Sequence, residues 1–169
     1  MTVAIAGTRP RSAFQTSRPA WRLATPACIV LLALVLVLPT AAGASNASLK
    51  RTLATWSQRI GADARGIGLS ALRRHPRRMT SRARHFRLDA LRARRALAAQ
   101  RPSTSRGWRA RRLGIAAFAN YAAVGREWVL SGTARLHHRN ALADRYALLA
   151  KRFATKGNRL LISAGRLLR

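Results

Sequence analysis

Residues 77–98, RRMTSRARHFRLDALRARRALA, combine an apolar helical stripe with a dense set of arginines. The apolar residues recur at steps of three and four, and they are Met79, Ala83, Phe86, Ala90, Ala93 and Leu97. At about 100° per residue this spacing places them on one face of an α-helix, and most of the arginines lie off that face. The stretch therefore predicts an amphipathic helix near residues 78–100 with a strongly basic solvent face.

A helical period also runs through the residues on either side of this stretch. The preceding segment has Asn46 in the position of an N-cap and is ended by Pro76. The following segment covers about 106–138, with Ser105 as its expected cap. Their apolar stripes are Leu49, Leu53, Trp56, Ile60, Ala64, Ile67 and Ala71 in the first and Leu113, Ala117, Tyr121, Val124, Trp128 and Leu136 in the second. Both segments are predicted to be helices.

The last segment separates apolar and charged residues most clearly. Asn140 is expected to cap it, and Asp144 is expected in its first turn, where the helix dipole favours an anion. One face has Leu142, Tyr146, Leu149, Phe153, Leu160, Ala164 and Leu167, and the other has Arg145, Lys151, Arg152, Lys156, Arg159 and Arg166. Four amphipathic helices with short connections predict an all-α bundle over residues 45–169, with an alanine-rich core in which helices approach closely.

Residues 1–44 are expected to be a targeting segment. Twelve uninterrupted apolar residues, 27–38, follow four arginines and precede the small-residue sequence Ala42-Gly43-Ala44. This order is typical of a secretory signal peptide, with cleavage after Ala44. Two alternatives stay open: an uncleaved signal anchor, and an organellar targeting sequence, since the first 62 residues contain no Asp or Glu. The predicted location is outside the cell or in the cell envelope, and the alternatives are membrane-anchored and organellar.

The charge of the chain points to an anionic partner. The 169 residues include 33 Lys and Arg against four Asp and Glu, a net charge of +29. Residues 73–112 hold 15 of the basic residues and a single acid, Asp89. Like charges repel along a helix, so this density exceeds that of an ordinary solvated face. Arginine suits phosphate in particular, because its planar fork can donate two hydrogen bonds at once.

The expected partner is an anionic envelope polymer, an anionic membrane surface or nucleic acid. The predicted contact residues are Arg73, Arg74, Arg77, Arg78, Arg82, Arg84, Arg94, Arg95, Arg109, Arg111 and Arg112. Trp108 lies between these charges and off the main stripe, so it is interpreted as a base-stacking or membrane-interface residue, or as a cover for the end of the bundle. A basic surface with no selected partner is the alternative interpretation of the whole pattern.

The sequence argues against catalysis, cofactors and metal binding. The single cysteine, Cys28, excludes an intrachain disulfide and a thiolate zinc site, and four carboxylates leave little for acid–base pairs. His137 and His138 point about 100° apart on a helix and are interpreted, like His75 and His85, as surface residues. We therefore expect a non-enzymatic exported helical protein that binds anionic surfaces. The alternatives are an organelle-targeted, nucleic-acid-associated protein and a signal-anchored envelope protein that assembles through its helices.

Overall fold

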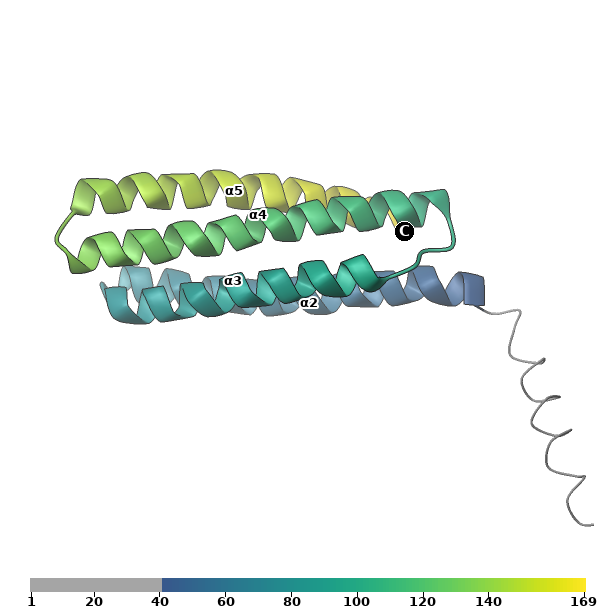
Figure 1. Ribbon diagram of the computed structural model, residues 1–169, viewed down its shortest axis with the longest axis horizontal. Coiled ribbons are helices and arrows are strands. Elements are labelled where there is room, and N and C mark those ends of the chain that lie inside the picture. Colours follow the sequence, from purple (N-terminus) through teal and green to yellow (C-terminus); the bar gives the residue numbers. More distant parts are fainter. Residues whose placement is uncertain (1–40) are drawn as a thin grey trace, which may run out of the picture. The chain divides into compact units, whose positions relative to one another are not determined.

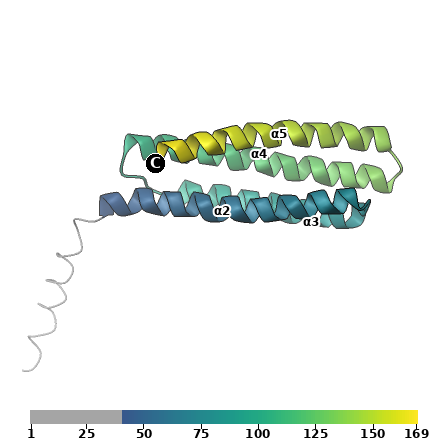
Figure 2. The same cartoon turned by 180° about the vertical axis from the view of Figure 1, so that it is seen from behind.

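The computed structural model describes residues 41–169, with side chains from Ser45 onward, so the predicted apolar targeting run at 27–38 lies outside the described residues. Four helices follow one another: α2 (Ala41–Leu72), α3 (Pro76–Ala99), α4 (Ser105–Leu136) and α5 (Asn140–Leu167). No strand occurs among these residues. Short connections make consecutive helices run antiparallel, as Figure 1 and, from behind, Figure 2 show. The predicted all-α bundle is confirmed.

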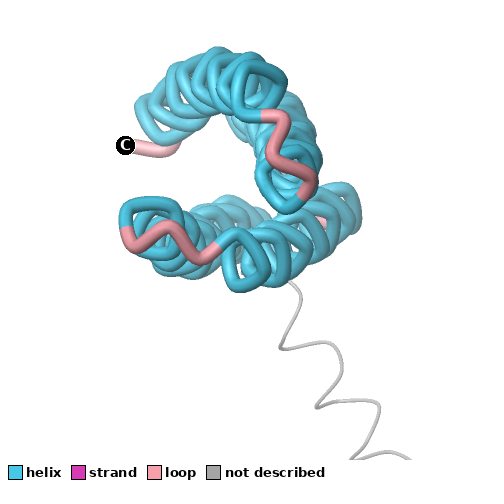
Figure 3. Tube along the Cα trace, turned by 90° about the vertical axis from the view of Figure 1, so that its left-hand side faces the viewer, coloured by secondary structure: helices cyan, strands magenta, loops and turns pink. Residues whose placement is uncertain are grey.

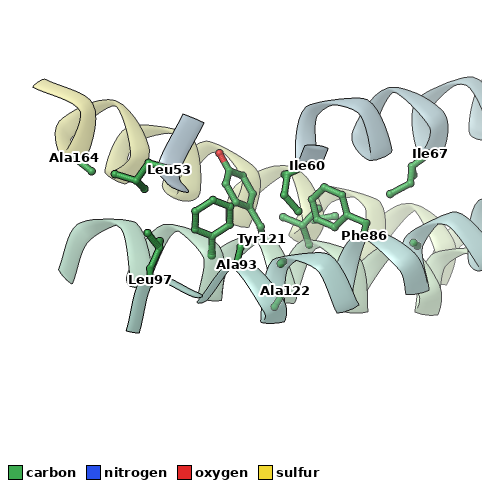
Figure 4. Close-up of a cluster of buried hydrophobic side chains, with 14 of the residues drawn as sticks. Leu53, Ile60, Ile67, Phe86, Ala93, Leu97, Tyr121, Ala122 and Ala164 are labelled. Carbon is green, nitrogen blue, oxygen red and sulfur yellow. The ribbon is translucent and has the colours of Figure 1, made fainter. Parts of the chain in front are cut away.

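The apolar stripe of α3 forms the centre of the core. All six of its predicted residues, spread over 79–97, are at most 2% exposed. Phe86 meets Tyr121 of α4 edge to face, with 6.2 Å between the ring centroids, and Phe118 lies 5.7 Å from the same ring. Ile60 of α2 belongs to this cluster, which Figure 4 shows in close-up. Burial of each large side chain is worth about 1.5–3 kcal/mol, so this cluster is the main source of stability between α2, α3 and α4.

The buried face of the last helix is shifted to one side of the face that its sequence predicts. Its buried residues are Ala143, Ala150, Gly157 and Ala164, which repeat every seven positions. Ala164 is buried as predicted, whereas the larger predicted residues flank this face: Leu149 is 39% exposed, and Leu142, Tyr146, Phe153, Leu160 and Leu167 are half-buried. A Cβ on Gly157 would lie 3.3 Å from the carbonyl oxygen of Ala117 in α4. Helices this close leave no room for leucine in the seam, so small residues fill it.

Two of the expected helix caps lie elsewhere. α2 begins at Ala41, so Asn46 is inside the helix, where its amide donates a hydrogen bond to Thr104 Oγ1 at 2.9 Å. Thr104, and not Ser105, caps α4 by accepting a hydrogen bond from the backbone N–H of Gly107 at 3.0 Å. The side chain predicted to start one helix therefore supports the cap of another. Spacing along the chain does not reveal this contact between distant residues.

The start of α5 also lacks its predicted cap. The helix begins at Asn140, and Arg139 in the N-cap position makes no capping hydrogen bond through its side chain. Asp144 is not in the first turn, and its carboxylate pairs with Arg135 of α4 at 2.8 Å. Asp144 therefore joins two helices across their connection, where the sequence predicted an interaction with the dipole of its own helix.

Within residues 41–169 the four helices form a row that does not close. α2 packs on α3 and to a smaller extent on α4, α3 packs on α4 and α4 on α5, whereas α2 and α5 make no extensive backbone packing with each other. Figure 3 shows the row curving into a C. Ala64, predicted for the core, is exposed and lies at this opening, and Leu136 at the end of α4 is 39% exposed. The remaining predicted stripe residues of α2 and α4 are buried or half-buried.

Candidate anion-binding face

Ten of the eleven predicted contact arginines are exposed, and Arg111 is half-buried. Arg73 and Arg74 lie in the connection before α3, six others lie on α3, and Arg109, Arg111 and Arg112 lie in the first turns of α4. The six on α3 are Arg77, Arg78, Arg82, Arg84, Arg94 and Arg95. The structure therefore places most of the predicted site on one helix and the two segments next to its ends.

Three of the α3 arginines form a line along the exposed side of the helix. Arg77, Arg84 and Arg95 are seven and eleven residues apart, a spacing that returns to the same helical face. Within residues 41–169 no carboxylate lies within 4.0 Å of these three side chains. We call this line the α3 arginine line. Its charge is not compensated by the described part of the protein.

The best-connected carboxylate of the described chain lies on the other side of α3. Asp89 is 5% exposed, and its two oxygens meet Arg59 of α2 at 2.6 Å and Arg92 at 3.1 Å. Both arginine side chains are more than half exposed, so they reach inward from the surface to cover the buried charge. This arrangement ties α2 to α3 and explains why neither Arg59 nor Arg92 adds to the α3 arginine line.

A polar hollow of about 400 Å³ lies at the seam between α2 and α3. Its lining on α3 is Arg78, Ser81, Arg82 and His85, and Asp63 contributes from α2. The four α3 residues have the spacing i, i+3, i+4 and i+7 of a single helical face. Guanidinium, hydroxyl and imidazole groups can all donate hydrogen bonds to a phosphate-like anion. Of these four residues only Arg78 and Arg82 were predicted contact residues, although the same spacing also places Ser81 and His85 on this face.

Asp63 forms one acidic wall of this hollow. Its Oδ2 atom is buried without a hydrogen-bond partner, and burial raises the pKa of this carboxyl above its ordinary value. The negative charge of Asp89 raises the pKa further, and the nearby charges of Arg59, His85 and Arg82 act in the opposite direction without cancelling the rise. The carboxyl therefore takes up a proton more readily than an exposed aspartate, which lowers its repulsion of an anion in the hollow.

Arg111 is engaged with the end of α3. Its Nε donates to the carbonyl oxygen of Leu97 at 3.0 Å, and one terminal nitrogen donates to that of Ala98. The guanidinium also lies over the ring of Trp108, 4.9 Å from the centroid. The last carbonyls of a helix have no partner within the helix, so Arg111 supplies one. These contacts direct Arg111 toward the protein and place it against the Trp108 ring that was expected to stack on a base or lie at a membrane interface.

Across 41–169 no three His, Cys, Asp or Glu side chains converge as metal ligands would. None of the four described helices has an apolar stretch long enough to cross a membrane. The chain matches no protein-family model, no curated protein and no solved structure. The arrangement of the arginines is therefore the feature from which a function can be argued.

Proposed function

We propose that this chain is a non-enzymatic, exported helical protein that binds anionic surfaces through α3 and the first turns of α4. The observation that carries the proposal is the α3 arginine line, whose three side chains have no carboxylate within 4.0 Å in residues 41–169. Uncompensated like charges on one helix repel each other, and an anionic surface removes that repulsion. Export is supported by the sequence pattern of residues 1–44 alone.

The binding is electrostatic and independent of base sequence. The α3 arginine line presents long, exposed side chains to a partner, and such side chains adapt to phosphate, sulfate or carboxylate groups of a polymer or lipid surface. The hollow around Arg78 and Arg82 adds one place where several donors meet a single anionic group. Successive anionic groups of an extended polyanion would then contact the α3 arginine line, and one further anionic group would enter the hollow.

The test compares two sets of six substitutions in the full chain. The first set replaces Arg77, Arg78, Arg84, Arg94, Arg95 and Arg112 with glutamine, and the second replaces Arg145, Lys151, Arg152, Lys156, Arg159 and Arg166. Arg111 is kept in both because it holds the end of α3. Both sets are exposed and remove the same charge, so a difference between them reports position and not net charge. Binding is measured to heparin, duplex DNA and anionic vesicles, with circular dichroism as the control for folding.

The first set should weaken binding to all three partners, and the second set should weaken it less. On DNA, each lost phosphate contact flattens the slope of log affinity against log salt by about 0.9. Equal weakening by the two sets would make the chain a diffuse polycation. Strong preference for one base sequence at physiological salt would instead favour a nucleic-acid protein. Mass spectrometry of the exported protein should find Ser45 at its N-terminus, and recovery of the intact chain in a membrane would contradict cleavage.

A further inference from the structure

Two adjoining hollows form one groove between α2 and α5, on the open side of the helix row seen in Figure 3. The larger hollow has a volume of about 380 Å³ and runs along α2 from Ser57 to Gly68. The smaller hollow, of about 200 Å³, shares Ser57 and Leu161 with it and reaches Lys50. We call the two together the α2–α5 groove.

The floor and walls of the α2–α5 groove are apolar. They include Ile60, Ile67, Phe86, Val124, Trp128 and Leu161. The hydroxyl of Tyr121 donates to Asn158 Oδ1 at 2.5 Å, and the hydroxyl of Ser57 donates to the carbonyl oxygen of Leu53 at 2.6 Å. Because these hydroxyls have partners within the protein, the groove offers an occupant mainly hydrocarbon contact.

Three glycines keep the groove open. A Cβ on Gly68 or Gly165 would meet no atom within 4 Å, and a Cβ on Gly61 would meet only the guanidinium of Arg65, at 3.8 Å. Gly61 and Gly68 lie inside α2, where glycine is less stable than alanine by about 0.8–1.0 kcal/mol, and Gly165 lies in the last turn of α5. Gly125 and Gly157, by contrast, are required by the close approach of a neighbouring helix. The three groove glycines have no such contact within the chain and instead leave space.

The dimensions of the larger hollow select the kind of occupant. The 11 steps from Ser57 to Gly68 correspond to a length of about 16 Å at 1.5 Å per residue. An alkyl chain, whose carbons approach their neighbours at about 4 Å, fits. The length matches half of a hydrocarbon core about 30 Å thick, which is one acyl chain.

The charges around the groove select the head group. Lys50 lines the smaller hollow, and neither hollow has a carboxylate in its lining. A second copy of this chain, with its net charge of +29, is repelled from such a surface. We propose that the α2–α5 groove binds a single-chain anionic amphiphile, a long-chain fatty carboxylate, with its alkyl chain in the larger hollow and its carboxylate at Lys50. This site lies on other helices than the α3 arginine line and does not depend on it.

Titration calorimetry of the full chain with palmitate tests the proposal. We expect saturable binding of one palmitate, which the groove-filling variants Gly61→Leu and Gly68→Leu weaken by about tenfold or more, a loss of about 1.4 kcal/mol. The matched control is Ala62→Leu, which adds the same side chain at a neighbouring exposed position outside the lining and should leave the affinity unchanged. Lys50→Gln should weaken palmitate about twofold to fivefold, as for an exposed ion pair, and should leave hexadecanol unaffected.

Other occupants give different results. Absence of saturable palmitate binding, or equal affinities of Gly68→Leu and Ala62→Leu, overturns the proposal. In a Gly68→Cys variant, a disulfide to Cys28 of the same chain would assign the groove to the chain's own apolar run, and a cross-linked dimer would assign it to a second copy. The six glutamine substitutions on α3 and α4 should leave palmitate affinity unchanged, so failure of the anionic-surface proposal and failure of this one are separable.

Discussion

Replacing Gly125 with alanine tests how closely α3 and α4 approach each other. A Cβ at this position would lie 2.7 Å from the Cβ of Arg87 and 2.9 Å from its Cα and its amide nitrogen. Carbon atoms pack at about 3.5–4.0 Å, so the two helices have to move apart locally by roughly 1 Å. Two of the three crowded atoms belong to the backbone, and a change of side-chain rotamer cannot relieve the contact.

The magnitude follows from two opposing effects. Overpacking a tight site costs about 1–3 kcal/mol. Alanine is favoured over glycine in a helix interior by about 0.8–1.0 kcal/mol. Gly125→Ala should therefore lower the free energy of unfolding by an amount between nearly zero and about 2 kcal/mol. Gly68→Ala is the matched control, because a Cβ there meets no atom within 4 Å and only the helix preference remains.

Urea unfolding of the full-length variants, followed by far-ultraviolet circular dichroism, measures both free energies. Gly68→Ala should be more stable than the unsubstituted protein by about 0.8–1.0 kcal/mol, and the two variants should differ by about 1–3 kcal/mol. If Gly125→Ala is as stable as Gly68→Ala, α3 and α4 are further apart than the structure places them. The explanation given for glycine at this position would then be wrong.

Three further predictions concern charged groups. Arg111→Ala should lower the free energy of unfolding by about 1–2 kcal/mol in urea titrations, because the carbonyls at the end of α3 lose their donors, whereas Arg112→Ala should change it by less than about 0.5 kcal/mol. Burial raises the pKa of Asp63, so the folded protein holds this proton more tightly than the unfolded chain does. The resulting stabilisation is fully present below the ordinary pKa of 3.8 and is lost as the pH rises through the folded-state pKa. Asp63→Asn should therefore raise the free energy of unfolding at neutral pH, as urea titrations at several pH values would show, and Asp89→Asn should lower the pKa of Asp63 in an NMR titration. Heparin at about 100 times its dissociation constant should add about 2.7 kcal/mol to the stability of the full chain, and an unchanged melting temperature would contradict binding to the folded form.

The sequence alone predicts the buried face of α3 correctly but places that of α5 to one side of the observed one. The reason is the size of the residues. In α3 the large residues Met79, Phe86 and Leu97 lie in the same apolar stripe, so burial of this one face removes all of them from water. Each is buried as predicted. In α5 the large residues form one stripe and the small residues form another beside it. Helix α4 comes close enough to bury the small stripe from Ala143 to Ala164, of which only Ala164 also belongs to the predicted face. Hydrophobic periodicity identifies the most apolar face of a helix, but it does not show how closely the neighbouring helix will approach.

In the candidate site, too, the sequence predicts some features and not others. Exposure of the α3 arginines followed from their positions off the apolar stripe, which is local information. Capture of Arg111 by the end of α3 depends on where α4 starts relative to that end, and the pairing of Asp89 with Arg59 depends on how α2 lies against α3. The α2–α5 groove depends on two helices that are not consecutive. Contacts of this kind are determined by packing and have no pattern in the sequence.

A row of helices has ends, and a closed ring does not. α2 packs on α3 and, to a smaller extent, on α4, so releasing it breaks fewer contacts than releasing α3 or α4. Local opening follows the cheapest cooperative unit. Backbone amides of α2 should therefore exchange with deuterated solvent before those of α3 and α4, although α2 is as long as α4.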